Sequence, residues 1–462
     1  MLDGDIKNSV EVIIMQISFL KRIRLNAVQI LAIGFAIVIF IGAILLTLPI
    51  ASSDGTVTNF LDSLFTSTSA VCVTGLITVD TGTHWSYFGK TVIMFLIEIG
   101  GLGFMSFATL IALLMRKKIT LKERLLLQEA LNASNIQGLV KLAKYLLIFT
   151  LSVQFSGALL LSTQFIPEFG VGKGIYYSIF HAISAFCNAG FDLIGNFSSL
   201  TGYANNSVII LTIGGLIAIG GLGFAVWAEL YNYKKSKRLS LHTKVVVSMT
   251  LFLIIAGSVL MFIFEFNNPG TMKEMSFKGK VLSSIFASIS PRTAGFNSIA
   301  TDAMSTAGKF LTIILMFIGG SPGSTAGGIK TATAGILLMT VISVIRGRND
   351  TEVFQKRISK EIVYRAFAVT TLGLALVTIV TMVLSITEVG ASFEYLLYEV
   401  TSAFATVGLT LGLTTKLTSI GKILIALTMY CGRVGPMTVV LALTNKKSNN
   451  AIRYPEEKIM VG

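Results

Sequence analysis

The sequence repeats itself four times, and this repetition constrains the fold more than any other feature. A small or polar pair, a glycine and then Leu or Phe occur in "VCVTGL", "FCNAGF", "PRTAGF" and "ATVGL". The glycines are Gly75, Gly190, Gly295 and Gly408, with spacings of 115, 105 and 113 residues. Four units, numbered 1 to 4 along the chain, therefore account for nearly all of it.

A second landmark follows each of these glycines. It consists of "IEIGGLGF" in unit 1, "IAIGGLGF" in unit 2, "MFIGGSPG" in unit 3 and "MYCGRVGPM" in unit 4. Its second glycine position lies 24 to 31 residues after the first glycine of the unit. Two signatures in the same order indicate that the four units share one local structure.

Long apolar runs separate the signatures. Hydrophobic residues make up 53% of the 462 residues and charged residues only 13%, against roughly 25% charged in soluble domains. The run at 28–50 reaches the ~20 apolar residues needed to cross ~30 Å of hydrocarbon. It follows a polar segment and lacks a small-residue cleavage site, so we expect it to be retained. The composition predicts an all-α, multi-pass membrane protein.

Hydropathy within one unit predicts a span, a re-entrant segment and a second span. Segments such as 59–71 and 393–405 are too short to span, but long enough for a half-helix that enters the membrane and returns. The prediction is four M1–pore-loop–M2 repeats, with eight transmembrane helices around a pseudo-fourfold pore. The predicted organisation is an N-terminal segment at 1–25, repeats at 26–116, 140–233, 243–346 and 361–445, and a C-terminal segment at 446–462.

The net charge of +14 would raise nucleic acid as a partner for a soluble protein. Here the basic residues lie in the inter-helix segments 116–144, 234–244 and 346–365 and at both ends of the chain, and not on one face of a folded domain. The positive-inside rule predicts that these segments and both termini are cytoplasmic in a cell-membrane protein. The basic residues therefore indicate a protein oriented in the lipid bilayer, and we expect no nucleic acid as a partner.

Side-chain chemistry for catalysis or metal binding is not indicated. The three cysteines and three histidines are too scattered for a recognisable metal spacing. A disulfide between Cys72 and Cys187 stays open, although small packing residues are the favoured interpretation. We expect no enzyme activity, because nothing supplies a nucleophile or metal set at membrane depth.

The repeated glycine loops predict an ion filter. Non-helical backbone at membrane depth is tolerated where it is buried or lines a watery cavity, and rings of carbonyl oxygens can replace the hydration shell of a cation. Glycine permits the necessary backbone angles. One loop alone fits close helix packing equally well, but four in register favour a filter. The predicted K⁺-binding residues are Val73, Thr74, Gly75, Asn188, Ala189, Gly190, Thr293, Ala294, Gly295, Thr406, Val407 and Gly408.

Unit 3 carries an additional feature. "FIGGSPGSTAGGIKTATAGI" (317–336) places six glycines and Pro322 inside the hydrophobic stretch 308–345, which is too long for one span. The break predicts an intramembrane loop beneath the filter that acts as a gate. The predicted gating residues are Gly319, Gly320, Ser321, Pro322, Gly323, Ser324, Thr325, Ala326, Gly327, Gly328, Lys330 and Arg433.

Three basic residues and one motif that resembles a nucleotide-binding site need to be considered with the loop. Arg433 lies inside a span, where charges are usually functional, and it either forms a barrier and pairs with loop carbonyls or caps helix ends. Lys330 could contact the gate or extend to the inner surface, and Arg292 is expected to hold the third filter loop. "GSTAGGIKT" resembles a phosphate-binding loop, but Ile329 separates Gly328 from its lysine. We expect no nucleotide on this chain.

These motifs resemble the Trk/Ktr/HKT superfamily of potassium uptake proteins, in particular the bacterial Ktr membrane subunit. The resemblance implies that the four glycines are filter glycines, that 319–330 is the gating loop and that Arg433 lies near it. Relatives with serine at the first filter glycine tend to pass sodium, so Gly75 favours potassium. The resemblance also implies a homodimer on a cytosolic ring of nucleotide-binding RCK-type regulators.

The expected function is therefore a potassium-conducting pore driven by the membrane potential. A sodium- or proton-coupled potassium symporter is the alternative. The sequence offers no chain of intramembrane carboxylates and histidines that would relay protons, but it does not decide between the two.

Overall fold

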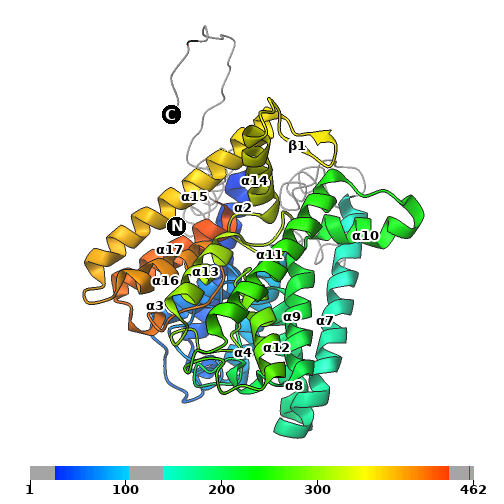
Figure 1. The fold of residues 1–462 in the computed structure, drawn as a ribbon. Coiled ribbons are helices and arrows are strands. Elements are labelled where there is room, and N and C mark those ends of the chain that lie inside the picture. Colours follow the sequence, from blue (N-terminus) through cyan, green and yellow to red (C-terminus); the bar gives the residue numbers. More distant parts are fainter. Residues whose placement is uncertain (1–26, 104–138, 436–456, 458–462) are drawn as a thin grey trace, which may run out of the picture.

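The computed structural model describes residues 27–103, 139–435 and 457 (Figure 1). The predicted terminal segments 1–25 and 446–462, apart from Glu457, lie outside the described residues, as do the predicted span ends at 104–116 and 436–445. Helices dominate the described part. Its only strands, β1 (Glu352–Val353) and β2 (Lys356–Arg357), form one antiparallel hairpin with Glu352 opposite Arg357.

The same order of helices recurs in the four units. Unit 1 has α2 (Ala27–Thr47), η1 (Pro49–Ala51), α3 (Phe60–Val71) and α4 (Tyr87–Leu102). Unit 2 has α7 (Leu139–Phe169), α8 (Val171–Phe186), η2 (Thr201–Tyr203), α9 (Ser207–Gly221) and α10 (Phe224–Ser236). Unit 3 has α11 (Leu241–Glu265), α12 (Phe277–Ile289), α13 (Thr306–Phe317) and α14 (Thr331–Ile345). Unit 4 has α15 (Lys360–Thr387), α16 (Phe393–Ala405), η3 (Thr414–Lys416) and α17 (Ser419–Val434).

The first helix of each unit is long and apolar enough to cross a membrane. These four spans are Gln29–Thr47, Ala143–Phe169, Leu241–Glu265 and Lys360–Thr387. A fifth is obtained if α9 and α10 count as one bent span. The described chain is thus a helical protein with several apolar spans, and the number of eight spans stays a prediction.

In units 1, 2 and 4 the second helix ends or bends at the second landmark, which reads "GGLG" in units 1 and 2 and "GRVG" in unit 4. Between α9 and α10 the chain turns by 97°, because Gly223 takes a φ of +87° that a helix cannot continue through. The second helix of the predicted repeat 140–233 is therefore broken at Gly223. Gly103 (+81°) and Gly435 (+95°) end α4 and α17 with the same left-handed angle.

Polar caps fix where the second helices begin. The capping side chains are Ser86, Asn206, Ser305 and Thr418, and each accepts a hydrogen bond from a backbone N–H in the first turn. In units 3 and 4 a buried carboxylate at the end of the first helix binds this cap. Glu265 accepts from the Ser305 hydroxyl, and Glu388 accepts from the Thr418 hydroxyl, both at 2.6 Å. First and second helices are thereby clasped at one end of these units.

The last unit packs against the first. Helix α17 lies against α3 (Figure 1), and Lys422 Nζ is 2.6 Å from Asp62 Oδ1 across this seam. Lys309 and Glu394 form the equivalent pair, at 3.9 Å, between units 3 and 4. Both pairs join the start of a second helix to the start of a neighbouring short helix. The chain therefore closes on itself.

Two of the basic segments lie together. The β1–β2 hairpin and α10 occupy the upper end of the molecule in Figure 1, and Lys244, near the start of α11, stacks on the Phe354 ring of the hairpin at 5.9 Å. One end of the described molecule therefore gathers much of the positive charge. This arrangement is what the positive-inside rule requires of a cytoplasmic face.

Candidate functional site: four glycine loops and a broken helix

The four glycine loops share an unusual backbone. Two positions in each loop, the glycine and the residue two before it, have positive φ. The glycine angles are +93° at Gly75, +72° at Gly190, +77° at Gly295 and +93° at Gly408, and the preceding angles are +58° at Val73, +61° at Asn188, +80° at Thr293 and +52° at Thr406. Left-handed angles at alternate residues turn successive carbonyls toward one side of the strand. Such angles are rare for β-branched residues and concentrate at functional sites.

The four glycines form a closed ring. A Cβ built on Gly190 would lie 2.8 Å from the Ala294 oxygen and 2.9 Å from the Gly295 Cα. Equivalent collisions occur from unit 3 to unit 4, from unit 4 to unit 1 and from unit 1 to unit 2, at the oxygens of Val407, Thr74 and Ala189 respectively. Each glycine thus abuts the carbonyl preceding the next unit's glycine. No side chain fits at any of the four positions without displacing this ring.

A serine near the end of each short helix holds its loop in place. The backbone N–H of the residue just before each of the four glycines donates to that serine's carbonyl, at 2.8 to 2.9 Å. The serines are Ser69, Ser184, Ser290 and Ser402. Their hydroxyls make a second bond. Ser69 and Ser402 accept from the N–H of the glycine itself, each at 3.0 Å. Because the amides point back to the helices, the opposite faces of the loops are left to the carbonyls.

The short helices end at these loops. Their C-termini carry partial negative charge, which favours a cation nearby. Cys72 and Cys187 are the C-terminal caps of α3 and α8 and are buried free thiols. No disulfide joins them, as the packing interpretation predicted.

The broken helix of unit 3 forms a compact loop between α13 and α14. Its ends are paired: the Gly319 N–H donates to the Ile329 oxygen and the Thr331 N–H to the Gly320 oxygen, both at 2.9 Å. The loop is pinned to the bend of unit 2. Ser321 donates to the Gly221 oxygen through both its N–H and its hydroxyl, each at 2.9 Å.

The loop lies directly against two of the glycine loops. A Cβ on Gly327 would collide with the Thr406 hydroxyl, and one on Gly319 would lie 3.1 Å from the Thr293 methyl group. Thr406 and Thr293 are the residues two before the glycines of units 4 and 3. The broken helix therefore covers the ring on the side of Thr293 and Thr406.

Both candidate gating cations bind carbonyls. Arg433 donates to the Thr325 oxygen of the loop and to the Gly100 oxygen at the end of α4, and lies 3.4 Å from the Gly101 oxygen. Lys330 Nζ donates to the Ala326 oxygen at 2.5 Å. Among the described residues neither forms an ion pair. Arg433 thus ties three elements together: α17, the loop and α4.

Arg292 lies behind the third loop. Its side chain is 7% exposed, and Nη2 donates to the Thr250 hydroxyl of α11 at 3.3 Å. This contact agrees with a role in holding the loop.

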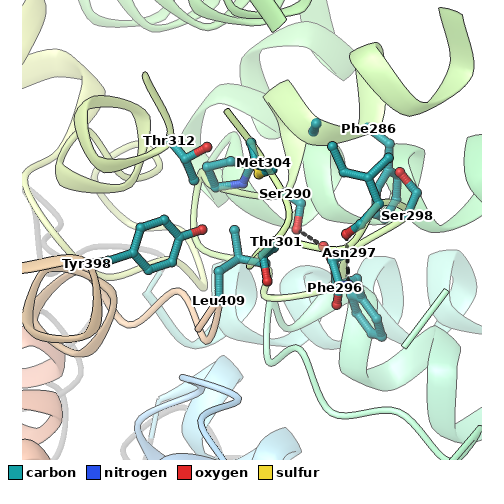
Figure 2. Close-up of a pocket in the computed structure, with 13 residues that line it drawn as sticks. Phe286, Ser290, Phe296, Asn297, Ser298, Thr301, Met304, Thr312, Tyr398 and Leu409 are labelled. Atoms are coloured by element: carbon teal, nitrogen blue, oxygen red, sulfur yellow. Dashed lines mark hydrogen bonds between the residues drawn. The ribbon is translucent and has the colours of Figure 1, made fainter. Parts of the chain in front are cut away.

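A small cavity lies behind the loops of units 3 and 4 (Figure 2). Its volume of about 20 Å³ is that of roughly one water molecule, far below that of a ligand site. Tyr398 and Leu409 face it from unit 4, and Ser290 and Thr301 from unit 3. The residues behind the loops of units 3 and 4 are therefore close-packed, with polar groups where the two units meet.

Sequence reasoning missed the serines. They occur six residues before the glycine in units 1, 2 and 4 and five before it in unit 3. That one-residue shift hides them from a comparison at fixed spacing. Aligning "SAVCVTG", "SAFCNAG", "SPRTAG" and "SAFATVG" by their first letter would have found them.

The family of the chain follows from its whole length. A family model described as a cation transport protein, TrkH, matches residues 21–454. The chain belongs to the TrkH family of cation transport proteins. The potassium/sodium uptake protein NtpJ of Enterococcus hirae is 48% identical over 447 residues, which cover 96% of this chain and 98% of that protein. The Ktr system potassium uptake protein B of Bacillus subtilis is 43% identical over 443 residues, with the same two coverages.

A solved structure supports the fold of this TrkH-family member. The potassium transporter TrkH of Vibrio parahaemolyticus matches with a TM-score of 0.74 over 92% of this chain and 86% of that one. At 18% identity the match shows the fold alone. The resemblance drawn from the motifs is confirmed, and the named relatives are transport proteins and not enzymes.

Proposed function

We propose that this TrkH-family chain is the potassium-selective, ion-conducting membrane subunit of a potassium uptake system. The observation that carries the proposal is the closed ring of Gly75, Gly190, Gly295 and Gly408. Carbonyls presented by four such strands replace the hydration shell of a K⁺ ion without any side-chain carboxylate. K⁺ is the transported ion, bound by the three residues of each loop that end at the glycine.

The broken helix is the gate in this proposal. Its position against Thr293 and Thr406 and its tether to Arg433 support this role. A loop held by hydrogen bonds to units 2 and 4 blocks the path until some of these bonds are exchanged. Arg433 adds a positive charge on the same path, which opposes cation entry.

The assembly and location follow the relatives. The named relatives include proteins of "Ktr systems", and we propose a homodimer in the cell membrane with both termini cytoplasmic. A cytosolic ring of RCK-type nucleotide-binding regulators docks on the basic end formed by α10 and the hairpin. Nucleotide is bound by that partner and not by this chain.

Coupled symport with Na⁺ or H⁺ is the second candidate, and the name of the Enterococcus relative, which mentions both potassium and sodium, keeps it open. The purified chain in liposomes distinguishes the two. For the pore, rubidium uptake follows the imposed voltage, since ~2.3 kcal/mol per charge is available per 100 mV. Uptake that persists without sodium and pH gradients supports the pore, whereas uptake that stops when either gradient is removed contradicts it.

A further inference from the structure

The four short helices can be compared at a second position. It lies three residues before the serine that holds the loop. The residues there are Thr66, His181, Ala287 and Glu399. The four units share the serine but differ at this position. The side chains behind the ring are therefore not the same in the four units.

In unit 2 the position binds the strand beyond the glycine. His181 is 0% exposed, and its Nδ1 lies 2.7 Å from the Tyr177 carbonyl oxygen. A carbonyl only accepts, so Nδ1 carries the proton and Nε2 has a free lone pair. Nε2 accepts from the Leu193 N–H at 3.3 Å. A neutral imidazole therefore holds the chain three residues past Gly190.

In unit 4 a carboxylate makes the same connection. Glu399 is 0% exposed and accepts from the Thr410 hydroxyl at 2.6 Å and from the Thr414 hydroxyl. Thr410 lies two residues past Gly408, and its carbonyl accepts from the Thr301 hydroxyl of unit 3 at 2.6 Å. The tether of unit 4 thereby extends into its neighbour.

Units 1 and 3 lack this tether. The Thr66 hydroxyl is buried without a hydrogen-bond partner among the described residues, and Ala287 has no polar side chain. Because the ring runs in the order of units 1, 2, 3 and 4, units 2 and 4 face each other across it. The two tethered strands are therefore diagonally opposite.

We propose that His181 and Glu399 are positioning residues that hold two opposed filter strands apart and thereby favour K⁺ over the smaller Na⁺. A ring of carbonyls can close around Na⁺ only if its strands move inward. A hydrogen bond from a fully buried side chain to the strand just past the glycine opposes that movement. The proposal rests on the proposed filter and extends it to the residues behind the ring.

Paired variants separate the hydrogen bond from packing. H181N keeps a donor near the position of the His181 Nδ1 but does not reach Leu193. H181Q places an acceptor near the position of the His181 Nε2. E399L removes both carboxylate oxygens of Glu399, which are the acceptors, and E399Q keeps one of them. We expect H181N, which loses the hydrogen bond to Leu193, to raise sodium flux relative to rubidium flux about fivefold. We expect E399L, which loses the hydrogen bonds to Thr410 and Thr414, to raise it at least as much. We expect H181Q and E399Q to stay within about twofold of the unchanged chain.

The measurement is the ratio of radioactive sodium to rubidium uptake by the full chain in liposomes, at one voltage. Thr66→Val is the matched control, since it changes the equivalent position without breaking a hydrogen bond, and its ratio should not move. Thr410→Val removes the Glu399 bond from the strand side. It should shift the ratio in the same direction as E399L, which keeps the test intact if E399L does not fold.

The outcomes distinguish this proposal from the filter on which it rests. If Gly408→Ser raises the sodium ratio but H181N, E399L and Thr410→Val do not, the tethers are wrong and the filter stands. If Gly408→Ser also leaves the ratio unchanged, the filter assignment itself fails. Equal shifts in H181Q and H181N, or in E399Q and E399L, overturn the tethers and indicate packing alone.

Discussion

At the scale of single residues, the site consists of backbone held in angles that side chains disfavour. Val73, Thr293 and Thr406 are β-branched, yet each takes a left-handed φ, which costs of order 1–3 kcal/mol per residue. The surrounding hydrogen bonds offset this cost, since a backbone N–H of each loop donates to the carbonyl of its serine. The backbone geometry of the loops is therefore imposed by the short helices and is not intrinsic to the loops.

The first prediction concerns Gly75→Ser. The new Cβ would meet the Ala189 oxygen and lie 3.1 Å from the Gly190 Cα, at a φ of +93°. We expect the preference for rubidium over sodium to fall about tenfold, equivalent to ~1.4 kcal/mol. Competition between the two ions during liposome uptake measures it.

The control for this substitution is Gly172→Ser on α8, where an added Cβ meets nothing within 4 Å. It should keep the ion preference of the unchanged chain. An unaltered preference in Gly75→Ser would remove loop 1 from the filter.

At the scale of elements, the sequence predicted the short helices closely. Segments 59–71 and 393–405 correspond to Phe60–Val71 and Phe393–Ala405. Their lengths and apolar patterns are local properties, so they are visible without tertiary contacts. The four loops were likewise found from the recurring glycine motif and its spacing, although their role as an ion site stays a proposal.

The bend in unit 2 could not be predicted in this way. In unit 3, Pro322 and clustered glycines marked the break, whereas "IGGLGF" in unit 2 is compatible with a continuous apolar helix. The bend depends on a distant contact, because the Phe224 N–H, freed at the bend, donates to the Gly323 oxygen of the unit 3 loop at 3.0 Å. The His181 and Glu399 tethers were missed for the same reason, since their partners lie beyond the loops.

The second prediction concerns the broken helix. Deleting Ser321 with Pro322 removes the hydrogen bonds of the loop to Gly221, and deleting Thr325 with Ala326 removes the one to Arg433. We expect rubidium flux without any regulator to rise about tenfold, as if a closed state lost ~1.4 kcal/mol. Uptake into liposomes at matched protein content measures the rise.

Inserting one glycine after Gln355, in the turn of the β1–β2 hairpin, is the control, because this turn lies away from the ring. Its flux should equal that of the unchanged chain. A well-folded deletion with equal or lower flux would show that the loop is a packing feature and not a gate.

At the scale of the whole molecule, the chain has two different ends. One end gathers the basic hairpin and α10, and the Lys244–Phe354 contact joins the hairpin to the start of α11. The seam between units 1 and 4, closed by Lys422 and Asp62, makes the ring complete within one chain. The proposed regulator would therefore have one charged face on which to dock.

The third prediction concerns this face. Charge reversal by Arg346→Glu with Lys356→Glu should lower the capture of a soluble nucleotide-binding partner about tenfold, since opposite charges steer such contacts. Co-purification from cells, followed by light scattering of the membrane subunit, measures both capture and the dimer.

Lys273→Glu with Lys278→Glu is the matched control, because these exposed lysines lie between α11 and α12 or at the start of α12, away from the hairpin. It should leave capture unchanged. Equal loss in both double variants, or a monomeric subunit, would contradict the proposed docking face or the homodimer.

The closed ring of glycines has a genetic consequence. A pore built from four copies of one gene product inherits each substitution four times, and a damaged copy can spoil rings that also contain intact ones. Here all four glycines belong to one polypeptide. A cell with one intact and one altered gene would make intact and altered rings side by side, never a mixed one. A substitution at one of these glycines therefore disturbs the ring of its own chain and leaves the ring of an intact chain unchanged, even where the two chains pair in a dimer.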